Sequence, residues 1–370
     1  MPGVIRVQRF DKWGYIMQVG VTLGFSNLRD DMTDAQMFRA EAQLALRVEE
    51  FGFDTVWAVE HHFDNYSMCT DNIQFLAWVA ARTDRVRLGT AAVILPWHDP
   101  LRVAEKMIML DILSEGRALF GMGRGLSRKE YASLGVDMGE SRERFDEAAA
   151  MILGALETGV ISGDGPFYSQ PEVELRPRPE SSFADRVYCV AGSPESVVSA
   201  VAAKGRLLAF ITGPVEDDMA NFLAYREQYE AAHGTEAPPI AVTLNLYCHD
   251  DGELARERAS GYVPRFFYSN VEHYEMAGEH FTGIGGYDRH DERARQLREL
   301  GLENAAARYA GAALVGTPDD VLATLAHVRD VLGRFELQLV PCFGGMPVEQ
   351  ADASLELLAR EVLPVAKKFD

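Results

Sequence analysis

The chain has 370 residues, of which 47% are apolar and 25% are charged, a composition typical of globular proteins. With 36 Lys and Arg against 56 Asp and Glu, its formal net charge is −20. A surface this acidic repels nucleic acid and anionic membranes, so we expect neither as a partner. Because no stretch approaches 18 uninterrupted apolar residues, we also expect no membrane span.

The cysteines are widely spaced and form no CxxC pair. This argues against a disulfide framework or a structural zinc site, and it fits a reducing compartment. Residues 1–16 carry charges throughout and lack the apolar core of a signal peptide. We therefore predict a cytoplasmic protein in which residues 1–16 are an extension outside the fold and residues 17–370 form a single domain.

Short apolar runs alternate with amphipathic helices along the chain. The first helix shows the pattern, because Thr33 and Gln36 can form a capping box and Gly52 can end the helix. Strands are predicted at residues 17–25, 54–59, 85–95, 117–123, 186–192, 206–213, 240–248 and 335–341. Helices are predicted at residues 33–51, 100–116, 141–159, 194–205, 215–233, 318–333 and 354–369.

Strict alternation of strands and helices indicates a parallel sheet, and eight units favour closure into a (β/α)8 TIM barrel. Residues 249–313, before the last strand, hold far more than one helix. A long insertion in a barrel is usually a lid or a binding loop, and a disordered surface excursion is the alternative.

The active site of such a barrel lies at the carboxyl ends of its strands. The second strand ends in Glu60, His61 and His62. Imidazole titrates near neutral pH, so a histidine pair there is suited to general acid–base catalysis. A metal site is less favoured, because adjacent histidines in an extended chain point to opposite sides and no HExxH motif is present. We therefore expect no metal.

The third and fourth strands end in small residues. Residues 90–92, Thr-Ala-Ala, either let a flat ring approach the backbone or simply pack tightly. The glycines at 121, 123 and 125 do not fit GxGxxG, since residue 126 is Leu. Arg124 in this glycine-rich loop could bind a phosphate through its planar guanidinium, or the loop could be merely basic and solvated.

The fifth strand runs into Gly192 and Ser193, and Ser196 follows in the first turn of a helix. The amides and dipole of a helix start form a seat for a phosphate, although Ser193 could also be a plain helix cap. Together, the strand ends suggest a phosphorylated planar cofactor with its ring near the histidines.

Several segments occur in a characteristic order: "EHHF", "GTAAVILP", "FGMGRGL" and "MGESRERFDE". In this order they resemble the luciferase-like flavin monooxygenase family, in particular its bacterial luciferase alpha-chain branch. The resemblance runs from Met17 to the last helix. It implies a TIM barrel, usually a homodimer, that takes reduced FMN from a separate NAD(P)H:flavin reductase. With O2 it forms a flavin C4a-hydroperoxide that oxygenates a small organic substrate.

The resemblance also implies roles for particular residues. His61 matches the family's catalytic base, with His62 in support, and Ala91 and Ala92 match a pair joined by a non-prolyl cis peptide beside the flavin. The matching cofactor-binding positions are Met122, Arg124, Arg142, Val190, Ala191, Gly192, Ser193 and Ser196, of which the two arginines together with Gly192, Ser193 and Ser196 surround the phosphate.

The sequence departs from the luciferase pattern near the substrate. Gly123 replaces a reactive cysteine, Ser127 stands at a tyrosine position and Gly192 replaces a glutamate. The resemblance therefore does not extend to aldehyde specificity or light emission. Two alternative functions are an F420-dependent dehydrogenase or reductase of the same superfamily and a non-catalytic flavin-binding relative.

Overall fold

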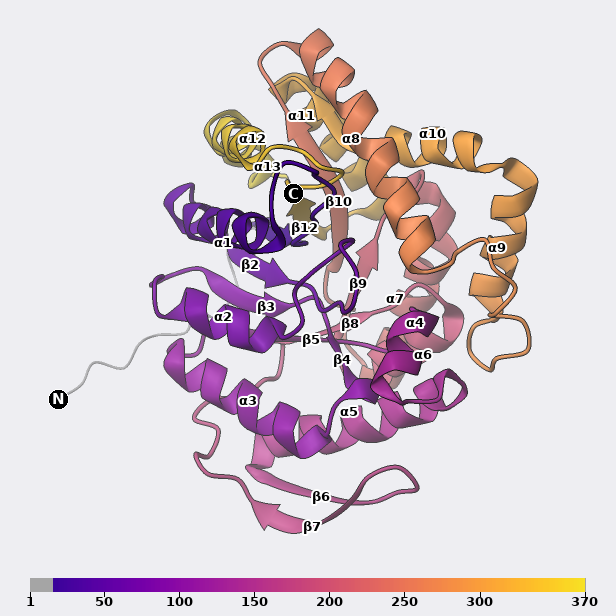
Figure 1. The fold of residues 1–370 in the computed structure, drawn as a ribbon. Helices are drawn as coiled ribbons and strands as arrows, with labels where there is room; N and C mark the ends of the chain where they lie inside the picture. The colour runs from indigo at the N-terminus through magenta and orange to yellow at the C-terminus, as the bar shows by residue number, and fades with distance from the viewer. Residues whose placement is uncertain (1–15, 370) are drawn as a thin grey trace, which may run out of the picture.

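In the computed structural model, which describes residues 16–369, eight parallel strands close into a barrel (Figure 1). Each strand pairs with the next, and the last pairs with the first, so the sheet has no open edge. The predicted TIM barrel is confirmed. Its strands are β1 (Val19–Leu23), β2 (Thr55–Ala58), β3 (Arg87–Thr90), β5 (Ala118–Gly123), β8 (Val187–Val190), β9 (Arg206–Phe210), β10 (Ile240–Cys248) and β12 (Phe335–Val340).

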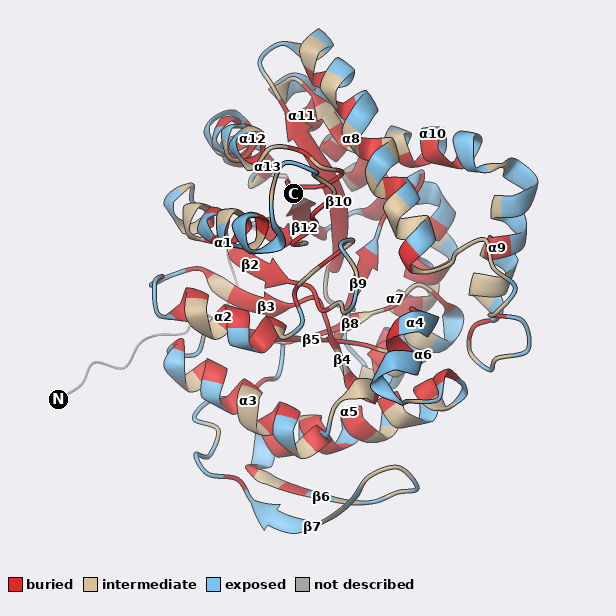
Figure 2. Cartoon of the chain, viewed as in Figure 1, coloured by how far each residue is buried: buried red, intermediate tan, exposed pale blue. Residues whose placement is uncertain are grey.

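The predicted helices form and surround the barrel, with their buried faces turned toward the strands (Figure 2). Capping determines several of their starts, as at Thr33, where the predicted capping box with Gln36 is present. The surrounding helices are α1 (Asp34–Glu50), α2 (Asn72–Ala80), α3 (Pro100–Leu113), α5 (Ser141–Thr158), α6 (Pro194–Ala202), α7 (Met219–His233), α11 (Pro318–Leu332), α12 (Val348–Glu361) and α13 (Leu363–Ala366).

Short elements also occur in connections that the sequence pattern left as loops. β4 (Val93–Ile94) pairs with β5, and α4 (Arg128–Leu134) follows the glycine-rich loop. An antiparallel hairpin of β6 (Val160–Asp164) and β7 (Ser169–Glu174) stands away from the barrel. These elements are too short for a helical or strand period to emerge from the sequence.

The insertion is an ordered helical unit and not a disordered excursion. It contains α8 (Gly252–His273), α9 (Asp288–Leu300) and α10 (Leu302–Ala312), and it returns to the barrel through β11 (Leu314–Gly316), which pairs with β10. It forms the orange part of Figure 1, beside the barrel. Its role as a lid stays a prediction. The predicted extension at residues 1–16 lies outside the described residues, apart from Ile16, which is exposed.

The middle of the barrel is filled by a separate apolar cluster around Trp57 and Tyr188, whose rings meet edge to face at 4.8 Å. Glycines on the neighbouring strands make room for the indole. A Cβ atom at Gly89 would lie 2.2 Å from the Trp57 ring, and one at Gly20 would lie 2.7 Å from it. The barrel is therefore a packed core, and reactants are expected at its rim.

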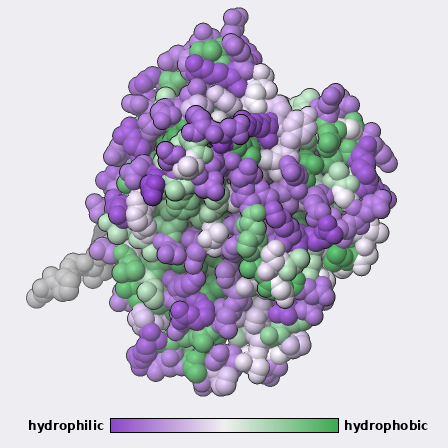
Figure 3. All heavy atoms as spheres, in the orientation of Figure 1, coloured by the Kyte–Doolittle hydropathy of each residue, from purple (hydrophilic) through white to green (hydrophobic). Residues whose placement is uncertain are grey.

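Among residues 16–369, no helix combines the length and the apolar character that crossing a bilayer requires. The face shown in Figure 3 is mostly hydrophilic, with hydrophobic side chains set back between hydrophilic ones.

The indole contact at Gly89 predicts the effect of adding one methyl group. Because Trp57 is closed in on several sides, Gly89→Ala is expected to lower the free energy of unfolding by about 1–3 kcal/mol. Urea denaturation followed by circular dichroism measures this. Gly154→Ala, on an exposed stretch of α5 with open space around the new methyl, is the matched control and is expected to be neutral or slightly stabilising. Equal midpoints for the two variants would show that the core tolerates displacement of the indole.

Candidate functional site

Glu60 is buried and fixes the start of the loop that follows β2. Its carboxylate accepts hydrogen bonds from Nε2 of His98 at 2.7 Å and from the backbone N–H of Ile94 at 3.2 Å, and Nε2 of His62 lies 3.4 Å away. Burial would raise the pKa of Glu60, but the hydrogen bonds from His62 and His98 outweigh burial, and the pKa is lowered. Glu60 is therefore an ionised anchor to which His62 is bound.

His61 has a different set of partners from His62, as expected for adjacent residues of an extended chain. Its Nδ1 lies 3.2 Å from Oε1 of Glu130, and its Nε2 lies 3.2 Å from the hydroxyl of Tyr274. Its backbone N–H donates to the carbonyl of Cys69 at 2.9 Å. The imidazole is thus held on both nitrogens by side chains from α4 and from the end of α8.

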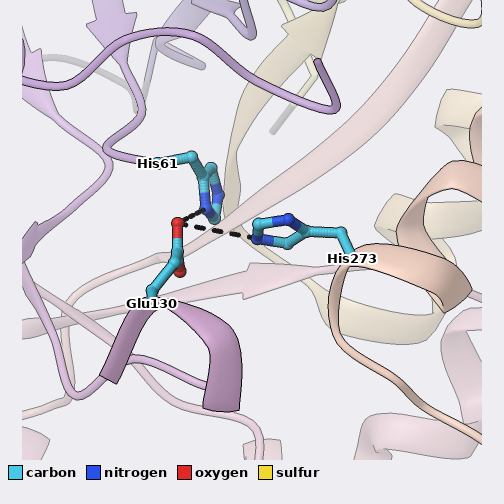
Figure 4. Close-up of side chains that lie close together, drawn as sticks. All are labelled: His61, Glu130 and His273. Atoms are coloured by element: carbon cyan, nitrogen blue, oxygen red, sulfur yellow. Dashed lines mark hydrogen bonds and ion pairs between the residues drawn. The ribbon is translucent and has the colours of Figure 1, made fainter. Parts of the chain in front are cut away.

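Glu130 is the buried carboxylate on which this part of the site is built. Oε1 accepts the backbone N–H of His62 at 2.7 Å as well as the His61 contact, and Nε2 of His273 lies 3.6 Å away. Burial opposes ionisation, yet the nearby His273 ring and the hydrogen bond from His61 outweigh it and lower the pKa of Glu130 to about 2. The carboxylate is therefore charged at neutral pH, between two histidine rings (Figure 4).

Glu130 was missed from the sequence, although a signal was present. Ser127 caps α4 and accepts the backbone N–H of Glu130 at 3.5 Å. Ser-x-x-Glu is the pattern of a capping box. This pattern predicts the start of α4, but it does not predict that the Glu130 side chain turns to the histidines.

The groups of His61, Glu130 and His273 are close enough to be considered for a cation. Their nearest ligand atoms all lie within 4.8 Å of one another. The carboxylate oxygen is already engaged by the His62 amide, and Nε2 of His61 is engaged by Tyr274. Hydrogen bonds therefore engage His61 and Glu130, while the two ring nitrogens of His273 and Oε2 of Glu130 have no hydrogen-bond partner among the described residues.

The peptide bond between Ala91 and Ala92 is cis, as the family resemblance implied. Asn72, at the start of α2, holds this turn through its amide, which donates to the carbonyls of Ala92 at 3.0 Å and Ala58 at 3.3 Å. The sequence gives no sign that Asn72 holds this turn, because the two carbonyls that it binds come from separate parts of the chain, the end of β2 and the turn after β3.

Small side chains from β5, from β8 and from the turn after β3 meet here. A Cβ atom at Gly123 would lie 3.4 Å from Cβ of Ala92 and 3.9 Å from Cβ of Val190, so the three form a shelf, and Cδ1 of Ile94 would lie closer still, at 3.1 Å. Met122 belongs instead to the main apolar core with Ala191, so the Met122 side chain does not join the shelf. A cofactor contact of these last two residues would have to use their backbone.

Arg124 and Arg142 converge on the insertion and have donors to spare. Arg124 donates to the carbonyl of Gly286 at 2.7 Å, and its guanidinium carbon lies 3.7 Å from the centre of the Tyr287 ring. Arg142 donates to Ser199 at 2.9 Å. Nη1 of Arg124 and both Nε and Nη2 of Arg142 are buried without a hydrogen-bond partner among the described residues. Burial and the nearby Arg124 both lower the pKa of Arg142.

The start of α6 is capped by its own side chains. Ser193 and Ser196 form a capping box, and Oγ of Ser196 accepts the backbone N–H groups of Gly192 at 3.1 Å and Ser193 at 2.9 Å. Plain capping is thus the arrangement present here. A phosphate contact from these residues stays a prediction and would involve rearranging these bonds.

The first turns of α9 add basic groups that the sequence analysis missed. Arg289 and Arg293 both bind Oδ1 of Asp218. A Cβ atom added at Gly192 would lie 3.9 Å from Nη1 of Arg293, so this arginine is close to the start of α6. Burial, together with Arg124, Arg293 and Arg289, lowers the pKa of His290 to about 3. These residues lie far from Arg124 and Arg142 in the sequence, in a segment rich in both acidic and basic side chains. Only the folded chain brings them close to the two arginines.

Two further basic residues that follow Arg124 in the sequence lie away from this anion site. Arg128 pairs with Glu275, and Lys129 donates to Asp64 at 3.1 Å, both on the exposed side of α4. A separate hollow of about 550 Å³ lies between the start of α5 and the turn of the β6–β7 hairpin. Its lining is acidic and contains none of the predicted site residues: Gly139, Glu140, Glu143, Glu147, Gly165, Pro166 and Phe167.

Comparison with known proteins gives relatives over most of the chain. The alkanal monooxygenase alpha chain of Aliivibrio fischeri is 28% identical over 292 residues, which are 78% of this chain and 82% of the relative. The 4-hydroxyprotoasukamycin monooxygenase of Streptomyces nodosus subsp. asukaensis is 27% identical over 347 residues, 88% and 85% of the two chains.

Solved structures with a similar fold include a monooxygenase from Streptomyces bottropensis, 29% identical, with a TM-score of 0.71 over 94% of this chain and 99% of that one. The oxygenating constituent of 3,6-diketocamphane monooxygenase from Pseudomonas putida, in complex with FMN, shares 18% identity, with a TM-score of 0.72 over 94% and 99%. An F420-dependent secondary alcohol dehydrogenase shares 15%, with a TM-score of 0.67 over 94% and 98%. At these last two identities the likeness shows the fold alone.

The match to a family model decides the assignment. Residues 17–334 match the model described as luciferase-like monooxygenase, which covers most of the chain and spans the histidine segment, the cis peptide and the two half-buried arginines, Arg124 and Arg142. The chain therefore belongs to the luciferase-like monooxygenase family.

Proposed function

We propose that the chain is the oxygenating component of a two-component monooxygenase that uses reduced FMN. It takes the reduced cofactor from a separate NAD(P)H:flavin reductase, uses O2 as co-substrate and inserts one oxygen atom into a small organic substrate. One observation carries the proposal: an acid-held histidine, a shelf of small residues and two arginines with free donors follow the strands β2, β3 and β5, which are neighbours in the barrel.

A phosphate fits the donors of Arg124 and Arg142. A buried guanidinium N–H without a partner is costly, and a dianion would satisfy several at once. The neighbouring Arg289 and Arg293 add positive charge on the insertion side. In a chain of net charge −20, this concentration of basic groups supports a bound anion and not a general electrostatic role.

A flat ring fits the shelf of Ala92, Gly123 and Val190, since none of these side chains projects far from the backbone. Reduced FMN supplies, when bound, the electrons that activate O2 for transfer of one oxygen atom. The protein's own part is to hold the ring at the rim, to limit access of water and to place His61 beside the reacting atoms. His61 then moves the proton, with ionised Glu130 stabilising its charged form.

An F420-dependent dehydrogenase is the second candidate, favoured by the fold that the chain shares with the F420-dependent alcohol dehydrogenase. Oxygen uptake separates the two. Under our proposal, the protein mixed anaerobically with reduced FMN and then with O2 gives a transient flavin absorbance that free FMN does not give. Hydride transfer to F420 from a secondary alcohol, with no such transient, would contradict the monooxygenase assignment.

The free donors predict how one arginine affects cofactor affinity. A hydrogen bond to a charged group contributes about 1.5–3 kcal/mol, so Arg124→Gln is expected to weaken FMN binding by roughly 10- to 100-fold. Riboflavin, which lacks the phosphate, should bind both proteins alike. Fluorescence titration measures both affinities, and Arg128→Gln on the exposed side of α4 is the matched control. An equal loss for FMN and riboflavin would mean that Arg124 shapes the pocket without binding the phosphate.

The position of His61 predicts a loss of chemistry with binding retained. In a screen of alkanals and cyclic ketones with reduced FMN and O2, His61→Asn is expected to lower product formation by about 100-fold or more, while FMN binding is unchanged. His327→Asn, a surface histidine of α11, is the control. The wild-type rate is expected to be the same with a chelator present, because the proposed chemistry uses no metal. Unchanged turnover in His61→Asn would support the non-catalytic alternative or another base.

A further inference from the structure

The end of α8 places a phenol on the catalytic candidate His61. Nδ1 of His61 faces the ionised carboxylate of Glu130, so this nitrogen carries the proton in the neutral ring. Nε2 is then the basic atom. Among the described residues its hydrogen-bond partner is the Tyr274 hydroxyl, at 3.2 Å. Because Nε2 can only accept, the Tyr274 O–H donates to it.

Tyr274 remains a proton donor over the usual pH range. Burial, followed by the neighbouring Tyr66 and Glu130, raises the pKa of Tyr274 well above its ordinary value. The His61 ring also meets the rings of Tyr66 and His273 edge-on at about 5 Å, so aromatic groups cover much of its surroundings. A proton can therefore reach Nε2 most directly through the Tyr274 oxygen.

We propose that Tyr274 is the relay through which His61 exchanges its proton with the reactants, so that the insertion supplies a working part of the site. This rests on the proposed function, in which His61 is the base. Tyr274 is not part of the family motifs quoted above, and it lies more than 200 residues from His61 in the sequence.

Neighbouring groups hold the relay in position. The His273 ring lies between two carboxylates, with Nε2 3.6 Å from Glu130 and Nδ1 3.4 Å from Asp64, and it stacks on Tyr66 at 4.7 Å. Asn270 donates to the Tyr66 hydroxyl at 3.1 Å. Lys129 pairs with Asp64 from the other side. Ser127, buried on α4, donates to the backbone carbonyl of His273 at 3.3 Å and so links α4 to the end of α8.

The proton transfer balances without a further reagent. An O–H or N–H bond of the reactant breaks, and a new O–H bond forms on Tyr274. At the same time, the original O–H bond of Tyr274 breaks and an N–H bond forms at Nε2 of His61. Tyr274 is neutral before and after, and the positive charge rests on His61 beside the carboxylate of Glu130.

The first test is the tautomer of His61, which does not depend on a substrate. Nitrogen NMR of histidine-labelled protein, with the His61 signals assigned by their loss in His61→Gln, is expected to show the proton on Nδ1 and a hydrogen-bonded Nε2. In Tyr274→Phe the Nε2 signal should move to the position of a free imidazole nitrogen. A proton on Nε2 in the wild-type protein would overturn the relay.

The second test follows reoxidation of bound reduced FMN by O2 in mixtures of H2O and D2O. Two protons move together in the wild type, so the rate is expected to curve with the deuterium fraction. Tyr274→Phe should slow the step by about 100-fold and remove the curvature. Tyr268→Phe, an exposed tyrosine on the same helix, is the control and should behave as wild type.

The outcomes separate the relay from the wider proposal. If Tyr274→Phe binds FMN normally and keeps both the wild-type rate and the curvature, the relay is wrong, while the loss in His61→Asn would leave the monooxygenase proposal standing. If both variants keep full activity, the assignment of His61 as base fails, and the relay fails with it.

Discussion

A buried negative charge on Glu130 organises the candidate site. Removing a carboxylate from water is costly unless donors surround it, and here an imidazole and a backbone amide donate to one oxygen, with a second imidazole close by. These donors come from the loop after β2 and from the end of α8, while the carboxylate itself belongs to α4. Three segments distant in the sequence are therefore held together by one group that is too costly to leave unpaired.

The sequence was sufficient for the barrel because every unit repeats the same signals: an apolar strand, a capped helix and a glycine or proline at the boundary. It also singled out His61 as a candidate, because strand exits are where a barrel presents its polar residues, and the catalytic role of His61 stays a prediction. It was not sufficient for Glu130, Tyr274 or Arg293. Glu130 and Arg293 lie on helices, and Tyr274 lies at the end of one. In the sequence each looks like an ordinary surface residue, because its contacts depend on tertiary packing that no local pattern encodes.

One departure from the luciferase pattern, at Ser127, lies in contact with the insertion. Ser127, at a position where luciferases have a tyrosine, is fully buried and touches the backbone of His273. A small side chain here leaves room for the end of α8 to approach the histidine loop. In this chain, Tyr274 at the end of α8 supplies an aromatic group to the histidine loop.

The contact of Arg124 with the insertion also bears on how long a ligand stays. Its guanidinium is already engaged by the Gly286 carbonyl and lies over the Tyr287 ring. An incoming phosphate that used both Nη1 and Nη2 would take Nη2 from that internal partner, so for this one donor only the difference between the two interactions would count toward affinity. A site built this way would hold a phosphate less tightly than one in which every donor is free. Weaker binding of this kind suits the cofactor that we propose, which is supplied in reduced form, leaves in oxidised form and is replaced in every cycle.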